Sequence, residues 1–334
     1  MTFRKLPLAI GTDRTFVFDN VGTPDGAWLI GVSQPNEFPQ TTKPSEAVLY
    51  RVADGTLRTM AQLETPTSQV LAASSDGHWV VWSEAADQPY FYDWRLRAYD
   101  ITTGAVSELA RAVDVNGSPV PGPYPVPSVS NGLAVWGQAV GPMGANPSEM
   151  SNGVVREADL ATGRISTLAT SAGMPVIAWP WITWGVWSGG TGYTRIEDLG
   201  TKQISRLDVM PPTIALNGRS AAYNDVESHS VFLIDDVAQS AARLIAQGVD
   251  AADHLEWITL NSRLVAWAQS TTTQVYDRAE QRVVALPMTF GRSAVYMCGP
   301  LAVWEDFDPG ASGQDNPTHL VILDSTYLGT LGAN

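Results

Sequence analysis

Three histidines and two aspartates are the residues of this sequence best suited to proton transfer. His229, His254 and His319 lie in the last third of the chain, with Asp225 and Asp306 in the same region. Imidazoles and carboxylates that converge can act as acid and base or bind a metal ion. The spacing contains no His-x-His pair, and the alternative is that these are solvated loop residues. The three histidines are the candidate acids, bases or metal ligands, and the two aspartates their partners.

Other catalytic signatures are missing from the sequence. There is no Gly-x-Ser-x-Gly nucleophile elbow, no phosphate-binding loop and no dinucleotide-binding fingerprint. Segment 306–312 is rich in oxygen ligands like a calcium-binding loop, but Pro317 stands where such a loop needs its Glu. The sequence therefore predicts no cofactor, with a divalent metal ion as the alternative.

Clustered aromatic side chains favour binding over catalysis. Tyr90, Phe91 and Tyr92 are closely followed by Trp94, and acidic residues flank them. Rings beside carboxylates suit a sugar ring or a basic protein surface. The alternative is that the cluster folds down onto its own loop. The predicted ligand-binding residues are Tyr90, Phe91, Tyr92, Trp94, Tyr124, Phe38, Trp187, Tyr193, Phe307, Glu84, Gln138 and Gln269.

A motif repeated along the whole chain must position these residues. Each copy has an apolar stretch ending in an aromatic residue, a strand ending in Asp, a tight turn and a final strand. A period of roughly 40 to 50 residues without helical patterns is typical of a β-propeller. The aromatic positions, which we expect to pack between blades, are Trp82, Trp136, Trp184, Tyr223, Trp267 and Trp304. The Asp positions are Asp100, Asp159, Asp198, Asp235, Asp277 and Asp324.

The repeat predicts an all-β fold, a seven-bladed β-propeller of four-stranded antiparallel blades, with residues 1–334 as a single domain. Blade one is a degraded copy in which Gly31 replaces the aromatic residue. Segment 3–6 resembles the last strand of the other blades. We expect this N-terminal strand to pair with the third strand of blade seven and close the ring. The competing prediction uses segment 327–331 instead.

The repeat resembles the TolB-like, or WD-like, propeller repeats of bacterial proteins. The pattern Gly-x-x-Val-x-Trp-x-Glu/Gln, followed by Tyr-Asp-x-x-Thr-Gly, carries the resemblance. It stands at 77–84 and 99–104, and in degraded form in the other blades. The resemblance covers nearly the whole chain and implies the fold. It implies no single function, because such propellers include binding scaffolds, peptidase gating domains and lyases.

Propeller topology predicts where the long connections lie. Connections between the second and third strands, and between consecutive blades, reach one face of the ring, here called the top face. The long connections at 34–45, 84–94, 111–127, 137–152 and 306–317 all belong to it, in blades seven, one, two and three. Long loops grouped on one side of a rigid scaffold usually carry function. Drift in tolerant loops is the alternative.

Two further groups of residues fall near the top face. Trp187 and Tyr193 flank the loop 188–192 outside the repeat register, and together they would form a stacking platform. A polar residue also follows two positions after most repeat aromatic residues. This group would ring a polar site or, alternatively, tie neighbouring loops by hydrogen bonds. Its members are Glu84, Gln138, Asp225, Gln269 and Asp306.

Composition limits the partners. A formal net charge of −14 and a pI near 4.6 disfavour nucleic acid and favour a soluble particle, which we expect to be a monomer. Cys298 is the only cysteine, so no disulfide can form within the chain, and we expect an inert buried thiol. The apolar stretches are too short for a signal-peptide core or a membrane span. We expect a secreted or periplasmic protein if the chain is a mature form, and a cytoplasmic one otherwise.

Two functions fit this sequence. The first is a non-catalytic binding propeller that recognises a protein or a glycan through the top-face loops of blades seven, one, two and three. The alternative is an enzyme of the lyase or cyclase type, with a pocket at the top of the central channel that uses histidines and carboxylates. The enzyme requires the three imidazoles to converge near the channel axis.

Overall fold

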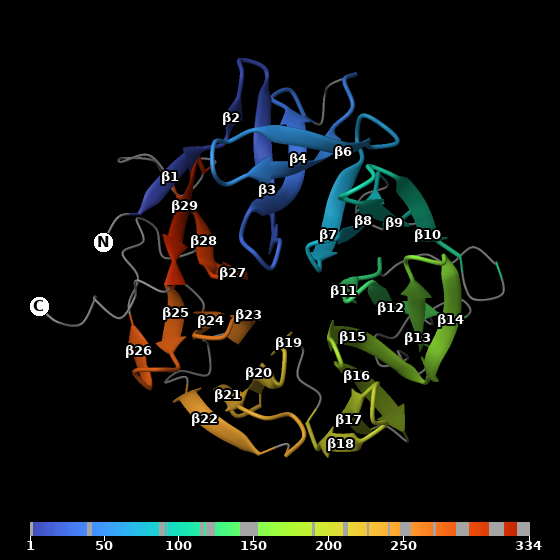
Figure 1. Cartoon of the computed structure of the whole chain (residues 1–334), viewed down its shortest axis with the longest axis vertical. Helices are drawn as coiled ribbons and strands as arrows, with labels where there is room; N and C mark the ends of the chain where they lie inside the picture. The colour runs from blue at the N-terminus through green and yellow to red at the C-terminus, as the bar shows by residue number, and fades with distance from the viewer. Residues whose placement is uncertain are drawn as a thin grey trace, which may run out of the picture.

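The chain folds into seven antiparallel sheets arranged in a ring (Figure 1). This computed structural model describes residues 3–38, 42–86, 91, 93–113, 117, 124–140, 153–188, 191–209, 213–225, 227–239, 241–247, 255–269, 272–284, 294–306 and 317–325. These residues form strands and turns and no α-helix. The predicted all-β, seven-bladed propeller is confirmed.

Within each blade the strands follow one another outward from the centre of the ring. Blades one to three contain β3 (Arg14–Gly22), β4 (Trp28–Pro35), β5 (Glu46–Arg51) and β6 (Leu57–Gln62); β7 (Gln69–Ser75), β8 (Trp79–Ala85), β9 (Arg95–Asp100) and β10 (Val106–Arg111); and β11 (Ser128–Ser130), β12 (Leu133–Ala139), β13 (Gly153–Asp159) and β14 (Arg164–Thr170). A short fifth strand, β2 (Ala9–Ile10), pairs with β3 in blade one.

The other four blades repeat this order. Blades four to six contain β15 (Ala172–Ala178), β16 (Trp181–Ser188), β17 (Thr191–Asp198) and β18 (Ile204–Leu207); β19 (Ile214–Asn217), β20 (Ser220–Asp225), β21 (Ser230–Ile234) and β22 (Ala242–Gln247); and β23 (Leu255–Leu260), β24 (Leu264–Gln269), β25 (Thr272–Asp277) and β26 (Arg282–Val284). Blade seven contains β27 (Tyr296–Cys298), β28 (Leu301–Asp306), β29 (His319–Asp324) and β1 (Arg4–Pro7).

The same backbone hydrogen bond recurs in every blade. The residue after the repeat Asp position donates its N–H to a carbonyl in the turn between the first and second strands. The seven bonds run from Val52 to Ala27, Ile101 to His78, Leu160 to Gly132, Leu199 to Pro180, Val237 to Arg219, Arg278 to Arg263 and Ser325 to Pro300. In blade one the position before the donor is Arg51. In blade five Asp235 keeps the predicted strand register, since Phe232 pairs with Tyr223, but Asp236 begins the turn.

The repeat Asp is explained by the turn that it begins. Oδ1 of Asp100 accepts hydrogen bonds of 2.7 and 3.1 Å from the backbone N–H groups two and three residues later. Asp159, Asp198 and Asp277 make the same pair of bonds. Such Asx turns satisfy backbone donors that the third and fourth strands leave unpaired.

The repeat aromatic residues are buried between neighbouring blades, as predicted. Trp82 of blade two, for example, packs against Ile30 and Leu49 of blade one. In blade one the equivalent residue is Gly31, and the ring of Phe16 from β3 occupies the vacant space. A Cβ atom on Gly31 would lie 2.7 Å from that ring.

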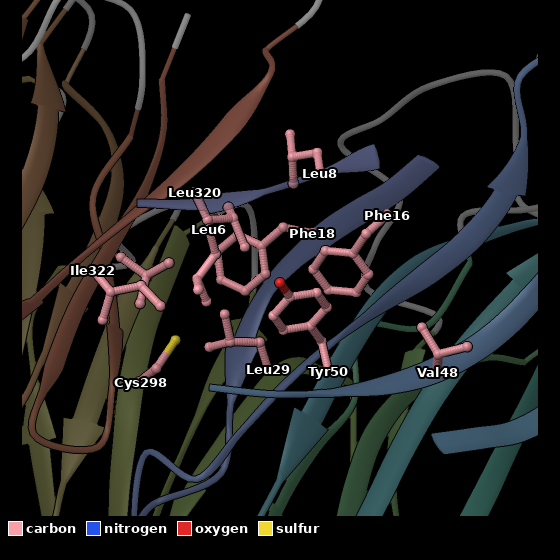
Figure 2. Packing of buried hydrophobic residues seen from close by; sticks show 11 residues of the cluster. Leu6, Leu8, Phe16, Phe18, Leu29, Val48, Tyr50, Cys298, Leu320 and Ile322 are labelled. Atoms are coloured by element: carbon pink, nitrogen blue, oxygen red, sulfur yellow. The ribbon is translucent and has the colours of Figure 1, made fainter. Parts of the chain in front are cut away.

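The N-terminal strand closes the ring. Strand β1 pairs antiparallel with β29, with Leu6 opposite Leu320. Leu6 belongs to a buried cluster with Phe18, Ile322 and Cys298, which joins blades seven and one (Figure 2). The predicted closure is confirmed, and segment 327–331 lies outside the described residues. Burial also raises the pKa of the Cys298 thiol, as expected for an inert cysteine.

Candidate functional site

The long connections of blades seven, one, two and three join the second and third strands, as predicted, but much of their length lies outside the described residues. Antiparallel strands place these connections on the same face as those between blades. A further long connection was not among the five predicted from the sequence. It spans 285–295, between β26 of blade six and β27 of blade seven.

The candidate proton-transfer residues belong to separate blades. In blade seven, Asp306 pairs across the sheet with His319. Asp306 is buried and accepts a 2.7 Å hydrogen bond from Nζ of Lys5 on β1, while Nδ1 of His319 lies 2.9 Å from Oγ1 of Thr318. Lys5 thereby ties the closing strand to blade seven through the Asp306 carboxylate.

Blade six separates these residues from Asp225 and His229, which belong to blade five. Asp225 accepts hydrogen bonds from the backbone N–H of Glu227 and the hydroxyl of Ser228, at 3.1 and 2.6 Å. His229 follows in the same loop, and His254 lies outside the described residues. Within the described part of the chain, no group of three or more His, Cys, Asp or Glu side chains is placed to hold a metal ion.

The structure divides the predicted aromatic cluster. Phe91 makes an edge-to-face contact with Tyr124, with 5.2 Å between ring centroids, so the connection within blade two packs on the one leading to blade three. Trp94 is only 3% exposed, which agrees with the alternative that the cluster folds down at this residue. Phe38 is half-buried beside a tight turn. Tyr90, Tyr92 and Phe307 lie outside the described residues.

Trp187 and Tyr193 do not form one stacking platform. Val186 stands directly opposite Tyr193 in the β16–β17 pair, so these two share a face of the sheet and Trp187 points to the other. Tyr193 stacks with the guanidinium of Arg206 at 4.1 Å from the ring centroid. Trp187 covers Gly173 on β15.

Two of the polar residues that follow repeat aromatics, Glu84 and Gln138, make contacts that support the blades. The Glu84 carboxylate accepts a 2.8 Å hydrogen bond from the Trp82 indole and lies 3.3 Å from the Arg97 guanidinium. Burial raises the pKa of Glu84, and these two donors oppose the rise. Gln138 accepts from the Trp136 indole and donates to the Val113 carbonyl, which ties down the connection after blade two. The Gln269 side chain lies outside the described residues.

A cavity of about 310 Å³ lies where the innermost strands begin, at the top-face mouth of the channel. Its walls come from blades three to seven and are mainly apolar. Three large apolar side chains on its rim are exposed: Val126 by 61%, Met174 by 41% and Trp257 by 56%. Exposed apolar groups that surround a cavity are typical of a binding site. No motif or spacing in the sequence marks any of these three residues.

Irregularities in the innermost strands place two of these side chains at the rim. Strand β15 bulges between Gly173 and Val176, and β23 between Glu256 and Ile258. Met174 and Trp257, the residues within the bulges, have φ angles of +54° and +48°. Bulky residues rarely adopt this left-handed conformation, and such strain is concentrated at functional sites.

A third bulge places a carboxyl group near the same cavity. Strand β3 bulges between Phe18 and Val21, and Asp19 lies within the bulge. Burial raises the pKa of Asp19 to about 7, and its Oδ2 atom is buried with no hydrogen-bond partner among the described residues. Tyr296 lines the cavity and is close enough to Glu305 and Asp19 for their charges to raise its pKa, after the larger effect of burial. Burial also raises the pKa of Glu305.

The opposite mouth differs in character. A cavity of about 810 Å³ is lined there by the turns between the first and second strands of all seven blades. Its lining is largely polar, with Trp179 as an exposed aromatic residue. Trp179 and Trp257 are therefore exposed tryptophans at opposite ends of the channel.

No protein-family model matches the chain, and no curated protein matches it significantly. Among solved structures, the β-propeller domain of the Trilobed protease from Pyrococcus furiosus aligns with a TM-score of 0.59 and 8% identity, over 98% of this chain and 100% of that one. A prolyl endopeptidase aligns with a TM-score of 0.58 and 13% identity, over 88% of this chain and 46% of that one. This chain thus spans about half the length of that enzyme.

TolB from Acinetobacter baumannii aligns more weakly, with a TM-score of 0.41 and 14% identity over 66% of this chain and 51% of that one. A similarity at this level does not select the TolB-like repeat over other propellers. No helix among the described residues is long and apolar enough to cross a membrane. The comparisons show that this chain has the β-propeller fold.

Proposed function

We propose that this protein is a non-catalytic binding propeller that takes up a protein or glycan ligand on its top face. The ligand inserts an apolar group into the cavity at the channel mouth, and the long connections of blades seven, one, two and three extend the contact. One observation carries this proposal: Val126, Met174 and Trp257 are exposed together around that cavity. Exposed apolar groups do not stabilise a monomer, whereas their burial in an interface contributes much of the binding free energy.

The experiment is a comparison of Trp257→Ala with the wild type on a displayed peptide library and a glycan array. We expect the wild type to enrich a defined set of peptides or glycans and Trp257→Ala to lose that set. Truncating a central aromatic residue of an interface typically costs about 2 kcal/mol or more, which is at least about a thirtyfold loss of affinity.

Trp179→Ala is the matched control, because it removes an exposed tryptophan from the opposite mouth. It should retain the enriched set. If Trp257→Ala and Met174→Ala both bind like the wild type, the top-face mouth is not the binding site and the proposal is wrong.

The described residues favour binding over the enzyme alternative. A lyase or cyclase using the predicted histidines needs them at one place, and His229 and His319 belong to blades five and seven. Asp306, their predicted partner, is engaged by Lys5. We therefore do not assign these side chains a catalytic role.

A further inference from the structure

We propose that the top-face cavity binds a cationic apolar segment of a partner protein, with the ammonium or guanidinium of a Lys or Arg received by Asp19 and Glu305 beside the Tyr296 ring. The neighbouring apolar side chain of that segment lies against Met174 and Trp257. This inference rests on the proposed function and specifies which ligand chemistry the same mouth selects.

A positive charge would stabilise the ionised forms of Asp19 and Glu305, and the described residues do not supply one. Neither Asp19 nor Glu305 has a described basic side chain that offsets its burial. Oδ2 of Asp19 also lacks any described hydrogen-bond donor. A buried carboxylate left without a donor is costly, and a bound cation removes that cost. By contrast, Glu84 and Asp306, which are buried elsewhere in the blades, are paired with Arg97 and Lys5.

Tyr296 connects the carboxyl groups to the cavity. It stands at the start of β27, the innermost strand of blade seven, and its ring lines the cavity. Phe18, the neighbour of Asp19, packs edge-on against that ring with 6.0 Å between centroids. Asp19 approaches from blade one through the β3 bulge, and Glu305 approaches from β28 of blade seven. The three polar groups thus lie together where blades seven and one meet, with Tyr296 in the cavity wall.

The apolar part of the ligand is set by the rest of the cavity wall. Met174 and Trp257 come from blades four and six, through bulges that resemble the one carrying Asp19. A polarizable thioether and an indole face suit an aliphatic or aromatic side chain, and the indole also attracts cations. An organic cation fits this mixture better than a metal ion, since no described group of three ligands is arranged for a metal.

Proton linkage supports the assignment. Tyr296 from β27 is close enough to Asp19 and to Glu305 from β28 for both carboxyl groups to raise its pKa, and no described basic side chain lowers the pKa of either carboxyl group. With a pKa of about 7, Asp19 ionises between pH 6 and pH 8. Its ionised fraction then rises from about 0.1 to about 0.9. A cation that binds the ionised carboxylate should bind about tenfold more tightly at pH 8 than at pH 6.

The experiment compares three acetylated dipeptide amides, Phe-Lys, Phe-norleucine and Phe-Glu, by ligand-observed NMR titration of the full chain up to about 10 mM, the range of weak contacts. We expect the cationic dipeptide to bind at least about tenfold more tightly than the neutral one at pH 8. Asp19→Asn and Glu305→Gln should each reduce that preference. Asp19→Asn should also abolish the pH dependence. Asp13→Asn removes an exposed carboxylate from blade one, which also contains Asp19. This variant should change neither the preference for the cationic dipeptide nor its pH dependence.

The outcomes separate this inference from the function on which it rests. Equal binding of all three dipeptides, lost in Trp257→Ala, would overturn the cation preference and leave the binding function standing. A cation preference that survives both Asp19→Asn and Glu305→Gln would place the charge recognition elsewhere and equally overturn it. If no dipeptide binds while the library still enriches Trp257-dependent ligands, the inference is wrong and the proposed function holds. If neither assay detects binding that depends on Trp257, both are wrong.

Discussion

At neutral pH, ionisation of the Asp19 side chain lowers the free energy of unfolding. Its pKa of about 7 in the folded chain lies above the ordinary 3.8 because burial disfavours the charged form. A carboxyl group whose pKa is higher in the folded chain than in the unfolded chain contributes its full stabilisation below about pH 4. That stabilisation is lost as pH rises through about 7. The difference corresponds to roughly 4 kcal/mol in total.

The substitution Asp19→Asn should remove this pH dependence. Between pH 5 and pH 8 the free energy of unfolding of the wild type should fall by about 2–3 kcal/mol relative to that of the variant. The measurement is urea unfolding at both pH values. Asp13→Asn serves as the control, because Lys43 lowers the pKa of Asp13 and this carboxylate stays ionised throughout that range. Parallel pH profiles for wild type and Asp19→Asn would show that Asp19 is not buried as described.

Single residues differ in how far the sequence reveals them. The burial of Trp82 and its equivalents was predictable, because one position repeated in six blades must meet the same neighbours in each. The burial of Trp94 was not, since it lies between repeats, where no periodicity tells a packed ring from an exposed one. Asp19 and Glu305 were missed for the same reason. Their importance comes from a contact between blades one and seven, at opposite ends of the sequence.

At the scale of elements, the strands followed from the repeat and the bulges did not. The extra residues in β3, β15 and β23 shift the register without changing the alternation of apolar residues nearby. Blade five likewise has one extra residue, so Asp236 begins the turn although Asp235 keeps the strand register. Bulges re-aim side chains, and here they place Met174 and Trp257 at the cavity and Asp19 near Tyr296.

Strand β1 carries the clearest prediction about an element. Leu6 is buried in the cluster that joins blades seven and one, so Leu6→Asp places a charge where the ring must close. We expect a loss of about 3 kcal/mol or more in the free energy of unfolding. Val106→Asp is the matched control on β10, the outer strand of blade two, where the side chain is exposed. Equal stability of the two variants in thermal melts would contradict closure by β1.

At the scale of the whole molecule, the ring separates two tasks. At one end, the turns between first and second strands of all seven blades line one cavity, and the repeat hydrogen bond fixes each of these turns within its own blade. The other end carries the long connections and the bulge residues Met174 and Trp257. The sequence predicted this division through the placement of its long connections. It could not predict the cavity itself, which exists only once five blades meet.

Closure also makes a prediction about how the molecule unfolds. In an open array each repeat contacts only its neighbours and the ends can unravel first. In this ring β1 and β29 remove the free ends, so the blades should unfold together. Buried repeat tryptophans report on blades two, three, four, six and seven, whereas far-UV circular dichroism reports on all strands. We expect the two probes to give coincident urea transitions. A fluorescence midpoint distinct from the dichroism midpoint, in the wild type at pH 7, would show that blades open independently and that β1 does not couple them.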